Sequence, residues 1–176
     1  GRANNLLAGR AAAVAAGFPS EKLPQGTVIT GNPLRPQIHE VLDRDQSYRP
    51  SEQGDEFHLL VIGGSQGAQF FGEAIPAAVA ALAEHHRARL RLTLQAREEQ
   101  LEQAKAALQA TGIEAEVAPF FDRMGERPAK AHLLISRAGA STLSEVAALG
   151  LPSILFPYPP ALDHDQAANA PALMAQ

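Results

Sequence analysis

The sequence contains no cysteine among its 176 residues. Disulfide bonds, thiolate-bound zinc and cysteine nucleophiles are therefore excluded, and the composition is compatible with a reducing compartment. Long apolar runs are also missing. The longest stretches, Ala11–Ala16 and Ala74–Ala83, are shorter than the roughly 20 residues that a membrane-spanning helix needs. Any work at a membrane is therefore expected to take place at its surface.

Positive charge is scarce as well. Lys and Arg number 15 against 19 Asp and Glu, which leaves a formal net charge of −4 and a pI near 5.9. A mildly acidic chain lacks the positive field on which nucleic-acid binding depends, so no nucleic-acid partner is expected. Hydrophobic residues make up 45% of the chain, which is enough to bury the core of one domain at this length.

Apolar segments alternate with helical segments from residue 57 onward. Strands are expected at 57–62, 90–94, 113–118, 133–136 and 153–156, and helices at 66–85, 98–110 and 140–149. This alternation predicts right-handed βαβ units, an α/β fold with a parallel sheet and helices on both faces. Ligands of such sheets bind beyond the carboxyl ends of the strands. Chemistry is therefore expected in the loops after Ile62, Ala118, Ser136 and Phe156.

The segment before residue 57 is less regular. An alanine-rich composition predicts a helix over 4–16, and a β-branched run predicts a short strand over 27–30. Residues 43–56 are polar and are interpreted as a solvated connector. In the regular part, Pro76 is expected to kink or break its helix, and the alternating strand 90–94 is expected nearer an edge of the sheet.

The run Gly63–Ala68, Gly-Gly-Ser-Gln-Gly-Ala, joins a strand to a helix. Glycines let a ligand approach the backbone, the amides of a helix N-terminus bind phosphate, and Ser65 would add a hydroxyl. The spacing is neither that of a dinucleotide fingerprint nor that of a Walker motif. The next strand ends in Leu94-Gln95 without an acidic residue, which disfavours a dehydrogenase. A tight turn without a ligand is the alternative.

The strand-to-helix junction over 136–145 has two interpretations. Thr142 and Glu145 have the spacing of a capping box, in which Glu145 would bond back to the backbone of the cap. Alternatively, amides and hydroxyls of Ala140–Thr142 contact an anion or a sugar, and Glu145 accepts hydrogen bonds from a diol. The spacing does not distinguish the two.

Two further polar groups follow expected strands. Asp163, His164 and Asp165 resemble metal ligands, but adjacent helical residues do not share a face, so helix capping or hydrogen bonding to a polar ligand is favoured. Arg35 follows the turn Gly31–Pro33 and is a candidate clamp for phosphate.

Four blocks, in their order and spacing, resemble the MurG family of glycosyltransferases: Thr30–Arg35, Gly63–Ala68, Arg137–Glu145 and Gln166–Ala170. The resemblance implies a GT-B arrangement of two Rossmann-like domains, of which this chain is the C-terminal, donor-binding one, truncated at its C-terminus. Residues 1–25 would then be the end of the N-terminal acceptor domain with its connection, and residues 26–176 the donor domain.

The resemblance also implies which residues bind the donor, UDP-N-acetylglucosamine. Arg35 and Ser65 would contact the diphosphate, the backbone of Phe121 would contact uracil, and Gln166 would reach the sugar hydroxyls. Diphosphate and ribose would be lined by a run in which Glu145 takes the ribose hydroxyls: Ala140, Ser141, Thr142, Leu143, Ser144 and Glu145. The family often reads Asp-Asp-His-Gln where this chain reads Asp-His-Asp-Gln at 163–166, which leaves the roles of His164 and Asp165 open.

The implied reaction is a single inverting displacement in peptidoglycan synthesis. The 4-hydroxyl of the muramyl sugar on an undecaprenyl-diphosphate-linked pentapeptide attacks the anomeric carbon of N-acetylglucosamine, and UDP leaves. Helix amides and Arg35 would stabilise the leaving charge, with neither metal nor cofactor.

The catalytic base, the lipid acceptor site and a peripheral contact with the cytoplasmic face of the bacterial inner membrane are expected in the N-terminal domain. The present chain is therefore expected to bind the donor without transferring it. An enzyme like UDP-N-acetylglucosamine 2-epimerase and a non-catalytic nucleotide-sugar-binding module are the alternatives.

Overall fold

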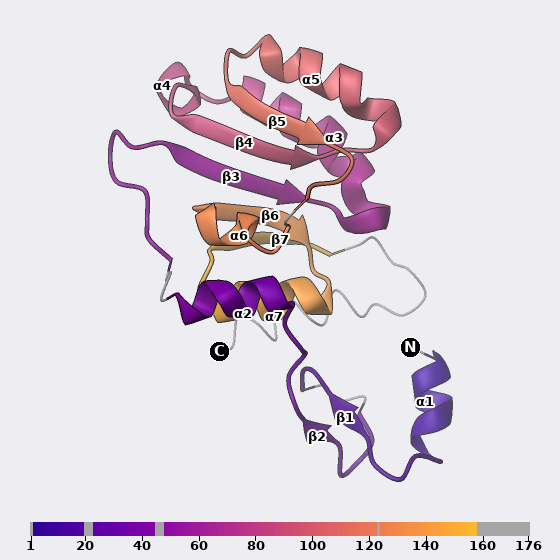
Figure 1. Ribbon diagram of the computed structural model, residues 1–176. Helices are drawn as coiled ribbons and strands as arrows, with labels where there is room; N and C mark the ends of the chain where they lie inside the picture. The colour runs from indigo at the N-terminus through magenta and orange to yellow at the C-terminus, as the bar shows by residue number, and fades with distance from the viewer. Residues whose placement is uncertain (1, 20–22, 45–47, 123, 158–176) are drawn as a thin grey trace.

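A five-stranded parallel sheet forms the centre of the computed structural model, which describes residues 2–19, 23–44, 48–122 and 124–157 (Figure 1). The strands are β3 (Phe57–Ile62), β4 (Leu90–Gln95), β5 (Glu114–Ala118), β6 (Leu133–Arg137) and β7 (Ser153–Phe156). Their order across the sheet is β5-β4-β3-β6-β7. The predicted α/β fold is confirmed, and because every pairing is parallel, all carboxyl ends lie at one edge.

Helices cover both faces of this sheet (Figure 1). One face carries α3 (Gly64–Ala80) and α5 (Leu101–Gln109), the latter preceded by the 3-10 turn η1 (Glu98–Gln100). The other carries α2 (Pro36–Asp43), α6 (Arg127–Lys130) and α7 (Ala140–Leu149). A short helix, α4 (Glu84–Arg87), precedes β4. The predicted helix over 66–85 is thus two helices; α3 runs through Pro76 and ends before residue 81.

Two apolar cores result, one on each side of the sheet. Neighbouring residues of the central strand β3 point to opposite faces, so that Val61 joins the core under α3 and α5 while Leu60 joins the core under α2 and α7. Phe71 and Leu94 are fully buried in the first core and Ile38 in the second. Burial on both faces explains why the sequence of β3 is almost continuously apolar.

β4 shows instead the alternation expected of a strand with one polar face. Leu90, Leu92 and Leu94 are buried under α3 and α5, whereas Arg91 pairs with Glu56 and Glu114 on the other side. The strand is nevertheless hydrogen-bonded on both sides, to β3 and to β5, and β5 is the edge strand. β4 thus lies next to the edge strand, and its alternation reflects one apolar and one polar face of the strand.

The N-terminal segment differs from the sequence-based expectation. The helix predicted over 4–16 is wrong beyond Ala8, where α1 (Arg2–Ala8) ends. The same segment supplies β1 (Ala15–Ala16), which pairs in parallel with β2 (Val28–Ile29), inside the predicted strand 27–30. Backbone pairing outweighs alanine's helix propensity here. These elements lie apart from the large sheet, on the side of α2 and α7 (Figure 1).

Candidate functional site

The strand order places a switch point beside β3 at the carboxyl edge of the sheet, the position at which open α/β sheets form a ligand-binding crevice. The chain passes outward from β3 to β4 and β5, then returns to place β6 on the other side of β3. The loops that follow β3 and β6 consequently diverge in opposite directions, and the space between them is where open α/β sheets bind ligands. Both loops carry the motifs singled out in the sequence, at 63–68 and 137–145.

The loop after β3 turns directly into α3. Gly64 has φ of +64°, a left-handed conformation that favours glycine. The amides of Gly63 and Gly64 both donate to Oε1 of Gln95, each over 3.2 Å. The amide nitrogen of Gln95 in turn donates to the carbonyl of Pro119 over 3.1 Å. Gln95 received no role from the sequence; its only signal is a polar amide as the last residue of a strand at the ligand edge.

The loop after β6 ends at Gly139, which is the N-cap of α7 in an extended conformation. No side chain of the described residues caps the helix. The capping-box interpretation is therefore wrong, because Thr142 stands three residues inside the helix and Glu145 bonds elsewhere. An uncapped N-terminus leaves amide donors and the positive end of the helix dipole for a ligand.

Glu145 and Arg35 form a bidentate ion pair. Nε of Arg35 lies 2.5 Å from Oε1 and Nη2 lies 2.5 Å from Oε2 of Glu145. The side chain of Glu145 is 8% exposed and that of Arg35 is 44% exposed, and the hydrogen bonds to Glu145 raise the pKa of Arg35. Pro36 holds Arg35 extended at the start of α2, and α2 packs on α7, which brings together two residues 110 positions apart.

A second contact ties the same connector to α7. Nδ2 of Asn32 donates to Oγ of Ser144 over 3.0 Å, and that hydroxyl donates to the carbonyl of Ala140 over 3.1 Å. The side chain of Asn32 also lies against the backbone of Gly17, where no Cβ would fit. Asn32 thus touches both the β1–β2 segment and the helix of the candidate site.

Phe121 lies beyond the carboxyl end of β5. Its side chain is buried beneath Arg127, whose guanidinium carbon is 4.4 Å from the ring centroid. Arg127 is fixed by two hydrogen bonds to Glu116, of 2.6 and 3.0 Å. The preceding Phe120 is 78% exposed at the same edge. A buried anchor next to an exposed ring gives this loop a defined backbone position.

The structure places the remaining predicted residues as follows. Ser141 is exposed at the start of α7, and Ala140 and Thr142 are half-buried beside it. Leu143 is fully buried and its amide donates to Gly139. The side chain of Ser65 is not among those described, and four positions singled out in the sequence lie outside the described residues: Asp163, His164, Asp165 and Gln166.

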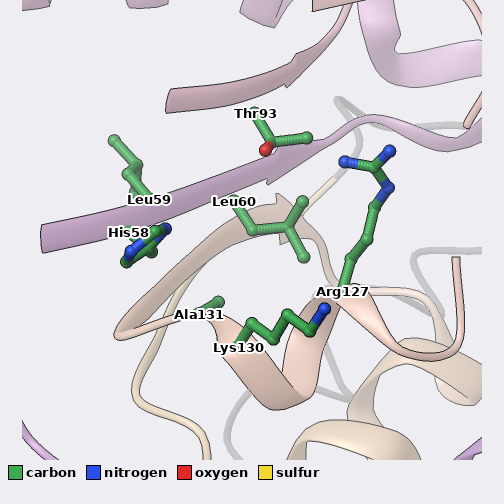
Figure 2. A pocket seen from close by; sticks show the side chains of 7 residues that line it. All are labelled: His58, Leu59, Leu60, Thr93, Arg127, Lys130 and Ala131. Carbon is green, nitrogen blue, oxygen red and sulfur yellow. The ribbon is translucent and has the colours of Figure 1, made fainter. Parts of the chain in front are cut away.

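An open cavity of about 200 Å³ lies elsewhere, between α6 and the strands β3 and β4 (Figure 2). Arg127 and Lys130 of α6 line it together with His58, Leu60 and Thr93. None of its lining residues was predicted as a site residue. Its lining residues in β3 and β4 precede the last residues of those strands, so this cavity is distinct from the site at the carboxyl edge. Among the described residues, no helix is long and apolar enough to cross a membrane, and no group of three or more His, Asp or Glu could hold a metal ion.

Comparison with known proteins adds to this geometry. Residues 58–176 match the glycosyltransferase family 28 C-terminal domain. Proteins of Brucella canis and Brucella abortus named UDP-N-acetylglucosamine–N-acetylmuramyl-(pentapeptide) pyrophosphoryl-undecaprenol N-acetylglucosamine transferase are 54% identical over 99% of this chain and 46% of their own length. The chain therefore spans just under half the length of these relatives.

The crystal structure of Acinetobacter baumannii MurG superposes with a TM-score of 0.73 at 29% identity, covering 98% of this chain and 46% of that one. The match includes the parallel sheet and the loops at its carboxyl edge, because it extends over nearly the whole chain. With the domain family matched from β3 onward, the chain belongs to the glycosyltransferase family 28 C-terminal domain family.

Proposed function

We propose that this chain is the donor-binding half of a transferase that moves N-acetylglucosamine from UDP-N-acetylglucosamine to a lipid-linked muramyl pentapeptide. The observation that carries the proposal is the buried carboxylate of Glu145, paired with Arg35 one turn inside the uncapped helix α7 at the crevice. This arrangement matches a ligand that carries an anion and a vicinal diol. The helix amides would bind the anion, and the carboxylate would accept hydrogen bonds from the diol. A nucleoside diphosphate sugar has both.

The ion pair leaves room for such a diol. An ionised carboxylate has about four lone-pair sites, and Arg35 uses two of them. The remaining two accept the ribose hydroxyls. The diphosphate then lies against the first turn of α7, Ala140 to Thr142, and against the start of α3 with Ser65, where the exposed part of Arg35 reaches it. The backbone of Phe121 contacts uracil, and Gln166 contacts the sugar.

The chemistry is an inverting displacement that releases UDP. Arg35 and the helix amides stabilise the charge that develops on the leaving diphosphate, because fixed dipoles in a crevice need no reorganisation during the reaction. The acceptor, its general base and the contact with the membrane surface belong to the N-terminal half of the protein. The division between residues 25 and 26 stays a prediction; β1 and β2 pair across it.

The experiment is a calorimetric titration of the chain with UDP-N-acetylglucosamine, without added metal. Saturable binding is expected, weakened at least about tenfold in Glu145→Ala and in Arg35→Ala, since each substitution removes charge-assisted hydrogen bonds. Glu102→Ala and Arg97→Ala, on exposed ion pairs elsewhere, are the matched controls and should bind as the wild type does. Equal affinity in all five proteins would contradict the proposal.

A further inference from the structure

The side-chain amide of Gln95 joins two loops that lie 55 residues or more apart in the sequence. It accepts from the amides of Gly63 and Gly64, in the loop after β3, and donates to the carbonyl of Pro119, in the loop after β5. β4 lies between β3 and β5. Because adjacent strands are about 4.8 Å apart, a side chain at the carboxyl end of β4 is placed to reach the loops on both sides.

The contacts call for the particular chemistry of a primary amide. A carboxylate could accept from the two glycine amides but could not donate to a carbonyl, and an ammonium could do only the reverse. The orientation of the amide is fixed by its partners, since a flipped group would place its NH₂ against two N–H donors and its oxygen against a carbonyl. Gln95 is therefore held at both ends of its amide.

We propose that Gln95 is a positioning residue of the donor site. It ties the glycine loop, which holds the diphosphate, to the Pro119–Phe121 loop, which holds the base, and so fixes the separation between the two halves of the nucleotide. This inference rests on the proposed function. It also has a consequence for the phosphate: Gln95 occupies the amides of Gly63 and Gly64, so the anion uses amides further along α3 and those of α7.

A tie between two subsites has a signature that a merely structural role lacks. A ligand that touches both loops benefits from their fixed separation, whereas a ligand that touches one loop does not. UDP spans both. Uridine lacks the diphosphate, and inorganic pyrophosphate lacks the nucleoside. Loss of the tie should therefore weaken UDP much more than it weakens either part.

The test uses the whole chain with three substitutions. Gln95→Met keeps the length of the side chain and removes both hydrogen-bonding functions. Gln95→Glu keeps the acceptor for the glycine amides and loses the donor to Pro119. Gln103→Met, at an exposed position of α5, is the matched control. For each protein, NMR measures the hydrogen exchange of the Gly63 and Gly64 amides without ligand, and calorimetry measures the affinity for UDP, uridine and pyrophosphate.

In Gln95→Met, exchange of both glycine amides should accelerate about tenfold, and UDP should bind about tenfold more weakly, as expected for the loss of two or three hydrogen bonds of ordinary net strength. Uridine and pyrophosphate should stay within about twofold of the wild type, since one-loop ligands gain nothing from the tie. Gln95→Glu should keep the slow exchange of the glycine amides while shifting the resonances of Phe120 and Phe121. Gln103→Met should change none of these values.

Two results would overturn the inference. One is an equal loss for UDP, uridine and pyrophosphate in Gln95→Met, which would assign Gln95 a general structural role. The other is unchanged exchange and unchanged UDP affinity. If the wild-type chain binds none of the three ligands, the proposed function fails and the donor role of Gln95 fails with it. If the wild-type chain binds UDP and Gln95→Met binds it equally well, the inference about Gln95 is overturned and the proposed function stands.

Discussion

Glu145 shows how a single carboxylate can be buried at low cost. Removing an ionised carboxylate from water is expensive unless hydrogen bonds replace the water. The fork of Arg35 supplies two such bonds in one plane. A lysine could offer only a point charge, so Arg35→Lys is not conservative at this position. The same geometry leaves the carboxylate oriented for a further pair of donors.

His132 predicts a pH dependence of stability. Burial lowers its pKa below 6.5, aided by the nearby positive charges of His58 and Arg89 and opposed by Asp55. Its Nδ1 also accepts a hydrogen bond of 2.9 Å from the amide of His58, which requires the neutral ring. The unfolded chain therefore binds the proton more readily. The contribution of His132 to stability is level above about pH 6.5 and falls as the pH drops below it toward the lowered pKa.

Urea unfolding of the wild type and of His132→Asn at pH 7.5 and pH 5.5 tests this. Asparagine keeps an acceptor but does not titrate, so the variant should lose less stability on acidification than the wild type does. His86→Asn, at an exposed site, is the control and should lose as much stability between pH 7.5 and pH 5.5 as the wild type does. An identical pH response in wild type and His132→Asn would refute the assignment.

At the scale of elements, the connector from β2 to α2 is held against α7 at two points, Asn32 with Ser144 and Arg35 with Glu145. The two contacts are made by adjacent residues of α7, Ser144 and Glu145. The connector between β2 and α2, which precedes the large sheet in the sequence, therefore holds α7 in place. α7 itself ends at Leu149 and is capped by Gly150, in a left-handed conformation that glycine adopts without strain.

Gly17→Ala tests whether the β1–β2 segment helps to hold Asn32 in contact with Ser144. A Cβ at residue 17 would overlap the side-chain amide of Asn32, which would have to move and give up Ser144. The expected cost is about 1 kcal/mol of unfolding free energy, the net worth of one hydrogen bond. Adding Ser144→Ala to Gly17→Ala should then cost less than the sum of the single changes.

Gly9→Ala is the matched control, because a Cβ there meets nothing within 4 Å. It should leave the urea midpoint unchanged. Additive costs for Gly17→Ala and Ser144→Ala would mean that the two residues are independent.

At the scale of the whole molecule, the strand order decides where a ligand binds. The crevice lies at the carboxyl edge beside β3, and the cavity under α6 lies on a face of the sheet (Figure 2). Arg127, one of the cations that line the cavity, is already paired with Glu116 by two hydrogen bonds. The uncapped N-terminus of α7 offers an anion more hydrogen-bond donors than the cavity under α6 does.

Adding UDP to the ¹⁵N-labelled chain should therefore shift amide resonances at 65–67, 119–121 and 139–145, and leave those of Thr93 and Lys130 unchanged. The physical reason is that the N-termini of α3 and α7 and the polar loops before them meet at the carboxyl edge. ADP, with the same diphosphate and a different base, serves as the control and should spare 119–121. Shifts centred on the cavity would relocate the site.

Local sequence already specified much of this protein. The apolar run predicts β3 and the loop after Ile62, and the glycine at 150 predicts the end of α7, because periodicity and glycine positions act over a few residues. β6 extends one residue past its predicted end, to Arg137. α2 went unnoticed even though Pro36 and the spacing of Ile38 and Val41 mark it in retrospect. Only the tertiary structure decided which distant groups meet. Gln95 contacts two loops, and Glu145 pairs with Arg35 and does not cap its own helix. Such contacts depend on strand order and helix packing, which no local pattern encodes.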